Sequence, residues 1–317
     1  MVSSVAPRAV PVAEHRRGVL LGATAYGLWG LFPLYWTLLA AAGAMEALAH
    51  RMLWSLVAVG TVLWFLGRRR GTGLAPVRAL VADRRRLGLL ALAAVLIACN
   101  WGGYIWGVTN GRVVETALGY FTGPIVSVLI GVLLLGERLR VAQWVAVGLG
   151  AVAVVVLAVG YGQVPWVALV LAFSFSLYGL VKKLADAPAV ESVAVEAGLS
   201  FVPALAFVCV VEASGSGTFF SLGIGHTLLL IGGGVVSTAP LLAFAGAAVR
   251  IPLSMIGLLQ YLAPVLQFAF GVLVFREQMP PERWLGFAIV WLGLIILTAD
   301  GMRRTRTPRA LEPPQPA

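Results

Sequence analysis

The sequence predicts an all-α polytopic membrane protein, with ten transmembrane helices arranged as two inverted five-helix repeats. Its composition is the first observation: 60% of the 317 residues are hydrophobic and 11% are charged, whereas soluble domains carry about a quarter charged residues. The second is a pattern that occurs twice along the chain, and the third is an uneven distribution of arginine and lysine between the apolar runs.

A helix needs about 20 apolar residues to cross the roughly 30 Å hydrocarbon core of a bilayer. None of the apolar runs alternates as barrel strands do, so helices are expected. The polar residues 1–17 lack the pattern of a cleavable signal peptide, so the first run is expected to stay as an anchor. The predicted spans are Gly18–Leu38, Met45–Leu66, Leu87–Val108, Val114–Leu135, Val141–Val159, Val164–Val181, Val193–Val211, Thr227–Val249, Leu253–Phe275 and Trp284–Ala299.

One membrane-length unit occurs twice. Four of its residues recur 140 positions later, and the stretches between them are almost wholly apolar in both copies. Internal repeats of this kind are typical of secondary transporters, in which two similar halves enclose a site. The recurring pairs are Pro124 and Pro264, Gly131 and Gly271, Glu137 and Glu277, and Trp144 and Trp284.

The basic residues predict the orientation. If the N-terminus is cytoplasmic and ten spans follow, the outside segments hold only Arg112, Arg276 and Arg283. The inside segments hold all the others except Arg51, which lies within the second span. Cytoplasmic loops are rich in lysine and arginine, so this bias supports ten helices with both termini in the cytoplasm. Five helices per copy is an odd number. The second copy is therefore expected to be inverted, with Glu137 inside and Glu277 outside.

The predicted organisation has four parts. Residues 18–160 form the first repeat and residues 164–299 the second, inverted repeat. Residues 1–17 and 300–317 are expected to be disordered cytoplasmic tails, because they hold little that can be buried. Residues 213–225, with their Ser-Gly-Ser-Gly run, are expected to form an outside loop.

Several stretches in order resemble one known family. Glu46–Ser55, Asn100–Pro124, Leu133–Trp144 and Leu171–Lys183 are similar to RarD proteins, of the EamA branch of the drug/metabolite transporter superfamily. The resemblance implies ten helices in two EamA repeats, a bacterial inner-membrane location and movement of small metabolites. The family label "chloramphenicol-sensitive" is derived from a phenotype and does not fix a substrate.

The best candidate site lies in the second span. Ionisable groups at membrane depth are costly, so Glu46, His50 and Arg51 are candidates for function. Glu46 and His50 are four residues apart and share a helix face. Arg51 is suited to a carboxylate or phosphate, and His50 to titration near neutral pH. The alternative is that all three lie near the outer surface and pair or snorkel there.

Asn100, Trp101 and Tyr104 form a second candidate group in the third span. The Asn100 amide is suited to a hydrogen bond with a substrate amide or hydroxyl, and the rings to an apolar wall. The alternative is that Asn100 joins neighbouring helices, as asparagine often does in membranes.

The duplicated element itself contributes a third group. We expect polar side chains of the fourth and ninth spans to face each other across the pseudo-axis, with core packing or interface anchoring as the alternative for the tyrosines. Prolines and glycines in these spans and in the eighth are candidates for hinges, substrate contacts or close helix packing. The polar residues are Glu115, Tyr120, Gln260, Tyr261 and Gln267, and the others are Gly119, Gly123, Pro124, Gly232–Gly234, Pro240 and Pro264.

Other acidic residues have local explanations. Glu196 is a candidate for a coupling carboxylate, but an interfacial pair with Lys182 or Lys183 is the simpler interpretation. Glu137 and Glu277 each follow an apolar run beside an arginine and are expected to pair locally at helix ends.

The motifs of several enzyme classes are missing from the sequence. It contains no phosphate-binding loop, no His-Glu-x-x-His motif and no Gly-x-Ser-x-Gly elbow. Cys99 and Cys209 lie in apolar runs and are expected to pack there, without a disulfide or a metal. We expect a transporter of small organic metabolites or drugs that is not an enzyme, uses no cofactor and binds no nucleic acid. A proton, a counter-solute and a homodimeric partner remain open, as do the alternatives of an enzyme for lipid-type substrates and a non-transporting scaffold.

Overall fold

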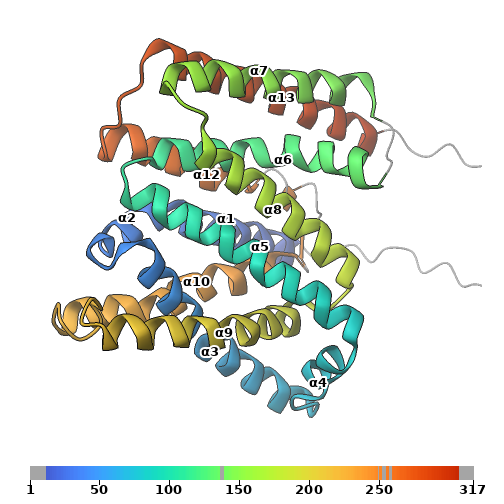
Figure 1. Ribbon diagram of the computed structural model, residues 1–317. Helices are drawn as coiled ribbons and strands as arrows, with labels where there is room; N and C mark the ends of the chain where they lie inside the picture. The colour runs from blue at the N-terminus through green and yellow to red at the C-terminus, as the bar shows by residue number, and fades with distance from the viewer. Residues whose placement is uncertain (1–11, 136–138, 249, 252–254, 257–258, 307–317) are drawn as a thin grey trace, which may run out of the picture. The chain divides into compact units, whose positions relative to one another are not determined.

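The computed structural model describes residues 12–135, 139–248, 250–251, 255–256 and 259–306. These residues form helices joined by short connections, and no β-strand occurs among them (Figure 1). Nine of the described helices are long and apolar enough to cross a membrane, and a further apolar helical segment is shorter. Each predicted span overlaps one of these segments, which confirms the all-helical polytopic fold.

The helices match the predicted runs with three differences. The first span is broken, a short helix lies between the second and third spans, and the ninth span contains a π-helical turn. In chain order they are α1 Val12–Gly30, α2 Phe32–Thr37, a 3-10 turn Ala40–Ala42, α3 Gly43–Arg70, α4 Ala75–Ala82, α5 Arg84–Thr109, α6 Val113–Leu135, α7 Val141–Tyr161, α8 Trp166–Ala185, α9 Ala189–Ala213, α10 Ile224–Ala248, α12 Leu262–Ala269 with the π-helical turn Phe270–Val274, and α13 Pro281–Arg306.

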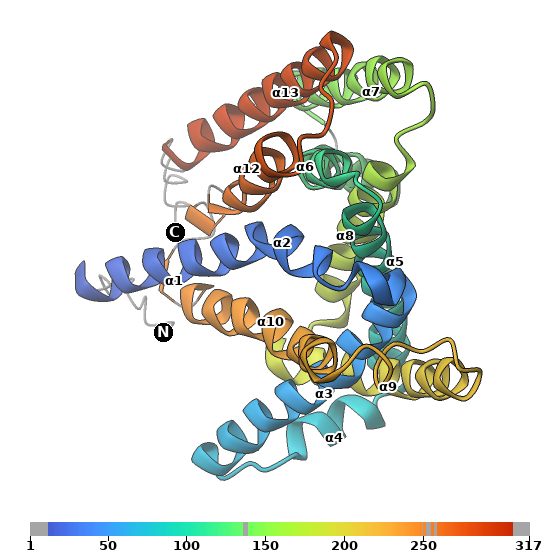
Figure 2. The same cartoon turned by 90° about the vertical axis from the view of Figure 1, so that its left-hand side faces the viewer.

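Helix packing repeats when the two copies of the sequence are exchanged. Helix α1 packs against α10, and α5 packs against α8, so each pair joins the first span of one copy to the third span of the other. Helices α3 and α9, the two second spans, also pack together, as do α7 and α13, the two fifth spans (Figures 1 and 2). The duplicated sequence therefore gives duplicated packing, as expected for two related repeats.

By contacts the chain forms two compact units. The first comprises Met1–Tyr120 and Trp166–Gln278, and the second Phe121–Pro165 and Met279–Ala317. Each unit takes helices from both sequence repeats, because helices of one copy pack mainly on helices of the other. All the polar candidate residues belong to the first unit. In the second, α7 and α13 lie side by side.

The glycines and the proline of the eighth span do not interrupt its helix. Helix α10 is continuous through Gly232–Gly234 and through Pro240, and α6 is continuous through Pro124. The interruption occurs in the ninth span, where α12 begins after a turn at Tyr261 and carries Pro264 in its first turn. Proline is tolerated in a first helical turn, because the N–H that it lacks has no intrahelical partner there.

Gly234 permits α10 to approach α3. A Cβ atom added at this position would collide with backbone atoms of Trp54 on α3, whereas one at Gly233 would lie 3.5 Å from the Trp36 ring, an ordinary contact. We predict that Gly234→Ala lowers the free energy of unfolding by about 1–3 kcal/mol through overpacking. Gly233→Ala is the control and should be neutral or slightly stabilising, since alanine favours a helix. Denaturation of the purified protein in detergent tests this, and equal effects of the two substitutions would contradict it.

Only one residue of the predicted small-residue pair on α6 packs closely. A Cβ atom at Gly119 would lie 2.9 Å from the Ala168 carbonyl oxygen on α8, so Gly119 permits close approach of these helices. Among the described residues no atom lies within 4 Å of a Cβ added at Gly123, so the structure shows no close helix approach at that position.

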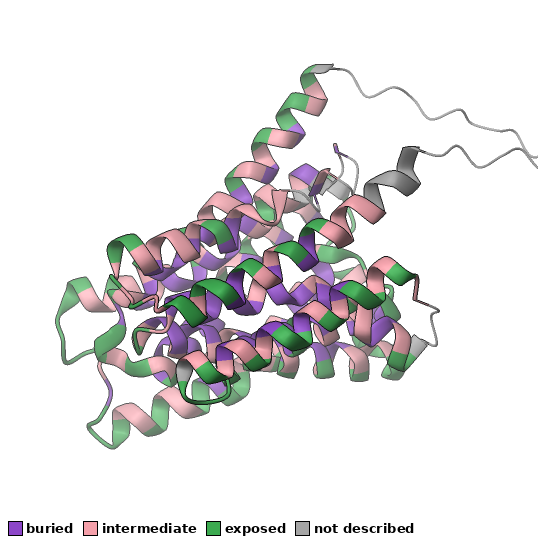
Figure 3. Cartoon of the chain, turned by 90° about the horizontal axis from the view of Figure 1, so that it is seen from above, coloured by how far each residue is buried: buried purple, intermediate pink, exposed green. Residues whose placement is uncertain are grey.

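Buried and exposed residues alternate along single helices (Figure 3). Large apolar side chains such as Val159 and Ile295 are exposed, as expected for residues that face lipid. Cys99 and Cys209 are also exposed, so the expectation that they pack in the protein interior is wrong.

Helices reach into both predicted tails, because α1 begins at Val12 and α13 ends at Arg306. Residues 1–11 and 307–317 lie outside the described residues. The short helix α4, which the sequence analysis does not anticipate, places Leu80 in a small core with Leu90 of α5.

Candidate functional site

Arg51 on α3 is buried in the first unit, with 3% of its surface exposed. Its guanidinium carbon lies 3.8 Å from the centroid of the Trp101 ring on α5. The corresponding distances are 5.2 Å to the Trp36 ring and 5.7 Å to the Phe32 ring, both on α2. A cation beside aromatic faces is attracted by their quadrupoles. The guanidinium is therefore enclosed by rings, which bring no formal negative charge.

The charge of Arg51 is not matched by a carboxylate. Among the described residues, no acidic side chain forms an ion pair with the guanidinium. Within the described part of the chain, Arg51 Nε, Trp36 Nε1 and the Tyr104 hydroxyl are buried without a hydrogen-bond partner. Such groups cost about 1–3 kcal/mol each when unpaired, and buried charges are normally paired. We call Phe32, Trp36, Arg51, Trp101 and Tyr104 the Arg51 cluster.

Asn100 joins three helices beside this cluster. Its Nδ2 donates to the Leu171 carbonyl on α8 at 3.0 Å, and its Oδ1 accepts from the Tyr120 hydroxyl on α6 at 3.1 Å. The Tyr120 ring centroid is 5.8 Å from that of Tyr104. These contacts favour the helix-joining role of Asn100, and they place Tyr120 at the edge of the Arg51 cluster.

Glu46 binds the connection between α9 and α10. Its Oε1 accepts from the backbone N–H of Thr218 at 2.7 Å and from the Thr218 hydroxyl at 2.8 Å. The same hydroxyl lies 2.8 Å from His226 Nε2. Because the hydroxyl proton goes to Glu46, His226 Nε2 acts as the donor to the Thr218 oxygen. Thr218 and His226 lie outside the second span, and no sequence pattern links either of them to Glu46.

His50 contacts the same connection through a ring. It stacks on Phe219 with a centroid distance of 4.6 Å and an interplanar angle of 10°. Both His50 nitrogens are buried, and no described residue forms a hydrogen bond with either. Glu46, His50 and Arg51 are thus all buried, but they divide into two sets: Glu46 and His50 hold the α9–α10 connection, and Arg51 belongs to the aromatic cluster.

Removal of the Glu46 carboxylate should loosen this connection. Glu46→Ala leaves the Thr218 N–H and hydroxyl without their acceptor, so we predict a loss of about 1–3 kcal/mol in the free energy of unfolding. Ser221→Ala is the control in the same connection. The Ser221 hydroxyl donates only to the nearby Gly217 carbonyl, so its removal should change stability by less than about 0.5 kcal/mol. Denaturation in detergent compares them, and an unchanged Glu46→Ala protein would contradict the prediction.

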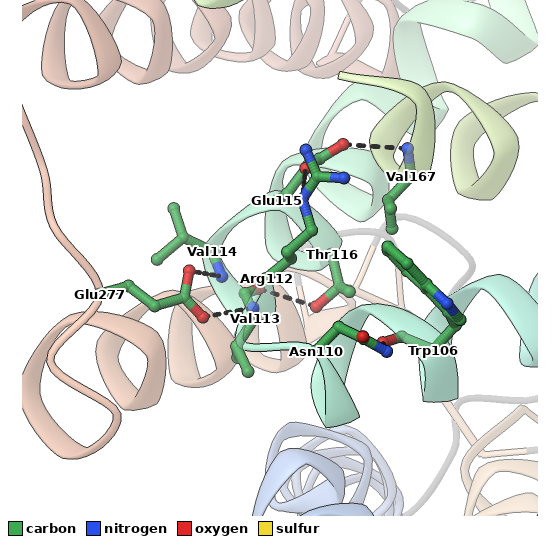
Figure 4. Close-up of polar contacts among 9 residues, drawn as sticks. All are labelled: Trp106, Asn110, Arg112, Val113, Val114, Glu115, Thr116, Val167 and Glu277. Carbon is green, nitrogen blue, oxygen red and sulfur yellow. Dashed lines mark hydrogen bonds and ion pairs between the residues drawn. The ribbon is translucent and has the colours of Figure 1, made fainter. Parts of the chain in front are cut away.

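Two carboxylates bind the starts of helices that are distant in sequence (Figure 4). Glu115 is fully buried; its Oε1 accepts from the Val167 N–H at the start of α8 at 2.9 Å, and its Oε2 pairs with Arg112 Nε at 2.8 Å. Glu277 accepts from the first two N–H groups of α6. Helix N-termini carry partial positive charge and unpaired N–H groups, so these contacts are stabilising. This role of Glu277 differs from the expected local pairing with arginine, and Glu137 lies outside the described residues.

The polar residues of the ninth span do not meet Tyr120. Gln267 Nε2 donates to the Trp29 carbonyl on α1 at 3.1 Å. Gln260 and Tyr261 are half-buried in the turn before α12. Among the described residues no hydrogen bond joins either of them to Tyr120, so the expected arrangement across the pseudo-axis is not found.

Glu196 has the partner that the simpler reading anticipates. It is buried, forms an ion pair with Lys182 and accepts from the Tyr178 hydroxyl at 3.1 Å. Its carboxylate therefore already has two partners, both on α8.

Comparison with known proteins gives one consistent answer. The model of the EamA-like transporter family matches residues 16–159 and 164–299. The chain is 57% identical to "Protein RarD" of Streptomyces exfoliatus, over 94% of this chain and 93% of that protein. It is 39% identical to "Uncharacterized transporter YojE" of Bacillus subtilis (94% and 99% covered) and 36% identical to "Protein RarD" of Escherichia coli (92% and 97% covered).

A solved structure supports the fold. A chain titled only "Crystal structure of protein" is similar with a TM-score of 0.54 and 22% identity, over 90% of this chain and 99% of that one. At this identity the likeness concerns the fold alone.

Proposed function

Because the chain belongs to the EamA-like transporter family, we propose that this multi-pass membrane protein is a secondary transporter of small organic solutes that works by alternating access. Two similar repeats with a solute site near the membrane midplane are the usual basis of that mechanism. The names of its relatives favour transport over an enzymatic role. In this proposal the protein lies in a bacterial inner membrane with both termini in the cytoplasm, as the arginine distribution predicts.

The Arg51 cluster is the observation that carries the proposal. A buried cation without an acidic partner is rare within membrane spans, where such groups mark substrate or ion paths. Aromatic walls with a few convergent polar groups are typical of small-molecule sites. The cluster combines both features, and it draws its residues from the first three spans of the first repeat.

Uptake into proteoliposomes tests the proposal. The purified protein, reconstituted without other proteins, should accumulate at least one labelled solute from a panel of anionic, neutral and cationic metabolites faster than protein-free vesicles do. A proton gradient or a preloaded counter-solute is then imposed to identify the coupling. No protein-dependent uptake under any gradient would contradict the transport function.

A further inference from the structure

Resting on the proposed transport function, we propose that the solute is a small organic monoanion whose carboxylate or sulfonate group is held by Arg51 and whose apolar body lies against the rings of the Arg51 cluster. The inference depends on three features: the atoms of the cluster without a hydrogen-bond partner, the hydrogen-bonding groups of the guanidinium, and the number of buried cations.

The unpartnered atoms of the cluster are donors. Arg51 Nε and Trp36 Nε1 each carry a hydrogen and cannot accept, and the Tyr104 hydroxyl can donate. A ligand that satisfies them must therefore bring acceptor oxygens. An ammonium group would need acceptors, but the nearby carboxylates are already engaged: Glu46 binds Thr218, and Glu115 binds Arg112 and the start of α8. The cluster is thus complementary to an anion.

The chemistry of the Arg51 guanidinium favours two parallel hydrogen bonds. Its carbon lies 3.8 Å from the centroid of the Trp101 ring. The N–H bonds of a guanidinium point outward in its plane, where they can donate to a ligand. Planar groups with two equivalent oxygens bind such an edge bidentately, as carboxylates do.

The count of buried charges indicates a single negative charge on the ligand. Arg51 is the one buried lysine or arginine among the residues whose burial the structure describes. One guanidinium neutralises one charge, and a second uncompensated charge would be expensive at this depth. A carboxylate or sulfonate therefore fits better than a doubly charged phosphate or phosphonate. The rings around the guanidinium make the surroundings of the bound group apolar, and Trp101 is the half-buried one among Phe32, Trp36 and Trp101.

A series of ligands with one ring and different head groups tests the proposal. Benzoate and benzenesulfonate are compared with neutral benzamide, cationic benzylamine and doubly charged phenylphosphonate. Binding to the purified full-length protein in detergent is followed by calorimetry. We expect the two monoanions to bind at least about tenfold more tightly than the amide and the amine, the ratio that one charge-assisted hydrogen bond provides. Equal binding of the amide or tighter binding of the amine would overturn the proposal, and tighter binding of the phosphonate would overturn the single-charge assignment.

Substitutions test whether the preference for monoanions depends on Arg51. Arg51→Gln should remove the preference for the monoanions, and Arg51→Lys should keep part of it, because lysine retains the charge without the planar edge. Arg17→Gln is the control, since Arg17 lies on α1 with 65% of its side chain exposed. If Arg51→Gln fails to fold, the head-group series on the unaltered protein still decides. Transport without an anion preference would refute this inference alone, whereas anion binding without transport of any solute would refute the proposed function alone.

Discussion

Arg51→Gln is expected to reduce the initial rate of transport of an anionic solute by at least about tenfold, while leaving the fold intact. Glutamine keeps much of the length and some donors of arginine but has no charge, so the solute loses its charge-assisted hydrogen bonds, worth about 1.5–3 kcal/mol. Arg51→Lys should retain intermediate activity. The measurement is uptake into proteoliposomes at matched protein density.

A control separates this effect from unfolding. Arg51→Gln removes a buried cation without an acidic partner, so its thermal stability in detergent should be equal to or higher than that of the unaltered protein. Arg17→Gln should leave both the rate and the stability unchanged. Full transport by a stable Arg51→Gln protein would remove Arg51 from the solute site.

Glu115→Ala is expected to cause the largest loss of stability, about 3–5 kcal/mol. The substitution leaves Arg112 without its ion-pair partner and the start of α8 without its acceptor, and removal of one partner from a buried ion pair is strongly destabilising. Glu115→Gln should lose less, because its amide oxygen can still accept from the Val167 N–H. The free energy of unfolding, measured by titration with a denaturing detergent, gives both values.

Glu14→Gln is the matched control for Glu115→Ala. Glu14 pairs with Arg250 at 2.8 Å, but 43% of the Glu14 side chain is exposed. Exposed pairs contribute about 0–1 kcal/mol. If the two glutamate substitutions cost the same, the helix-capping role assigned to Glu115 is wrong.

The number of spans and their duplication could be predicted from the sequence. The apolar runs gave the ten segments, because membrane thickness sets the length of every span. The 140-residue repeat predicted two copies, but it did not predict that helices of one copy pack mainly on helices of the other. The break after Gly30 was missed, although Pro33 sits in the first turn of α2, where it starts a new helix.

The site was predicted in part. The rarity of ionisable groups in spans identified Arg51 directly. Its aromatic neighbours Phe32 and Trp36 were missed, since they belong to another helix and aromatic residues are common in membrane proteins. The separation of Glu46 from Arg51 was also missed. It depends on Thr218, whose contact with Glu46 joins residues 172 positions apart. No local pattern reports such a contact.

Counterflow in proteoliposomes tests the central claim most directly. Vesicles containing the purified protein are preloaded with an unlabelled solute that the protein takes up, then diluted into a trace of the same solute in labelled form. A carrier with one site exposed alternately to the two sides predicts a transient accumulation of label above equilibrium, absent from protein-free vesicles and strongly reduced by Arg51→Gln. Label that only approaches equilibrium, at the same rate with and without preloading, would contradict alternating access through the Arg51 cluster.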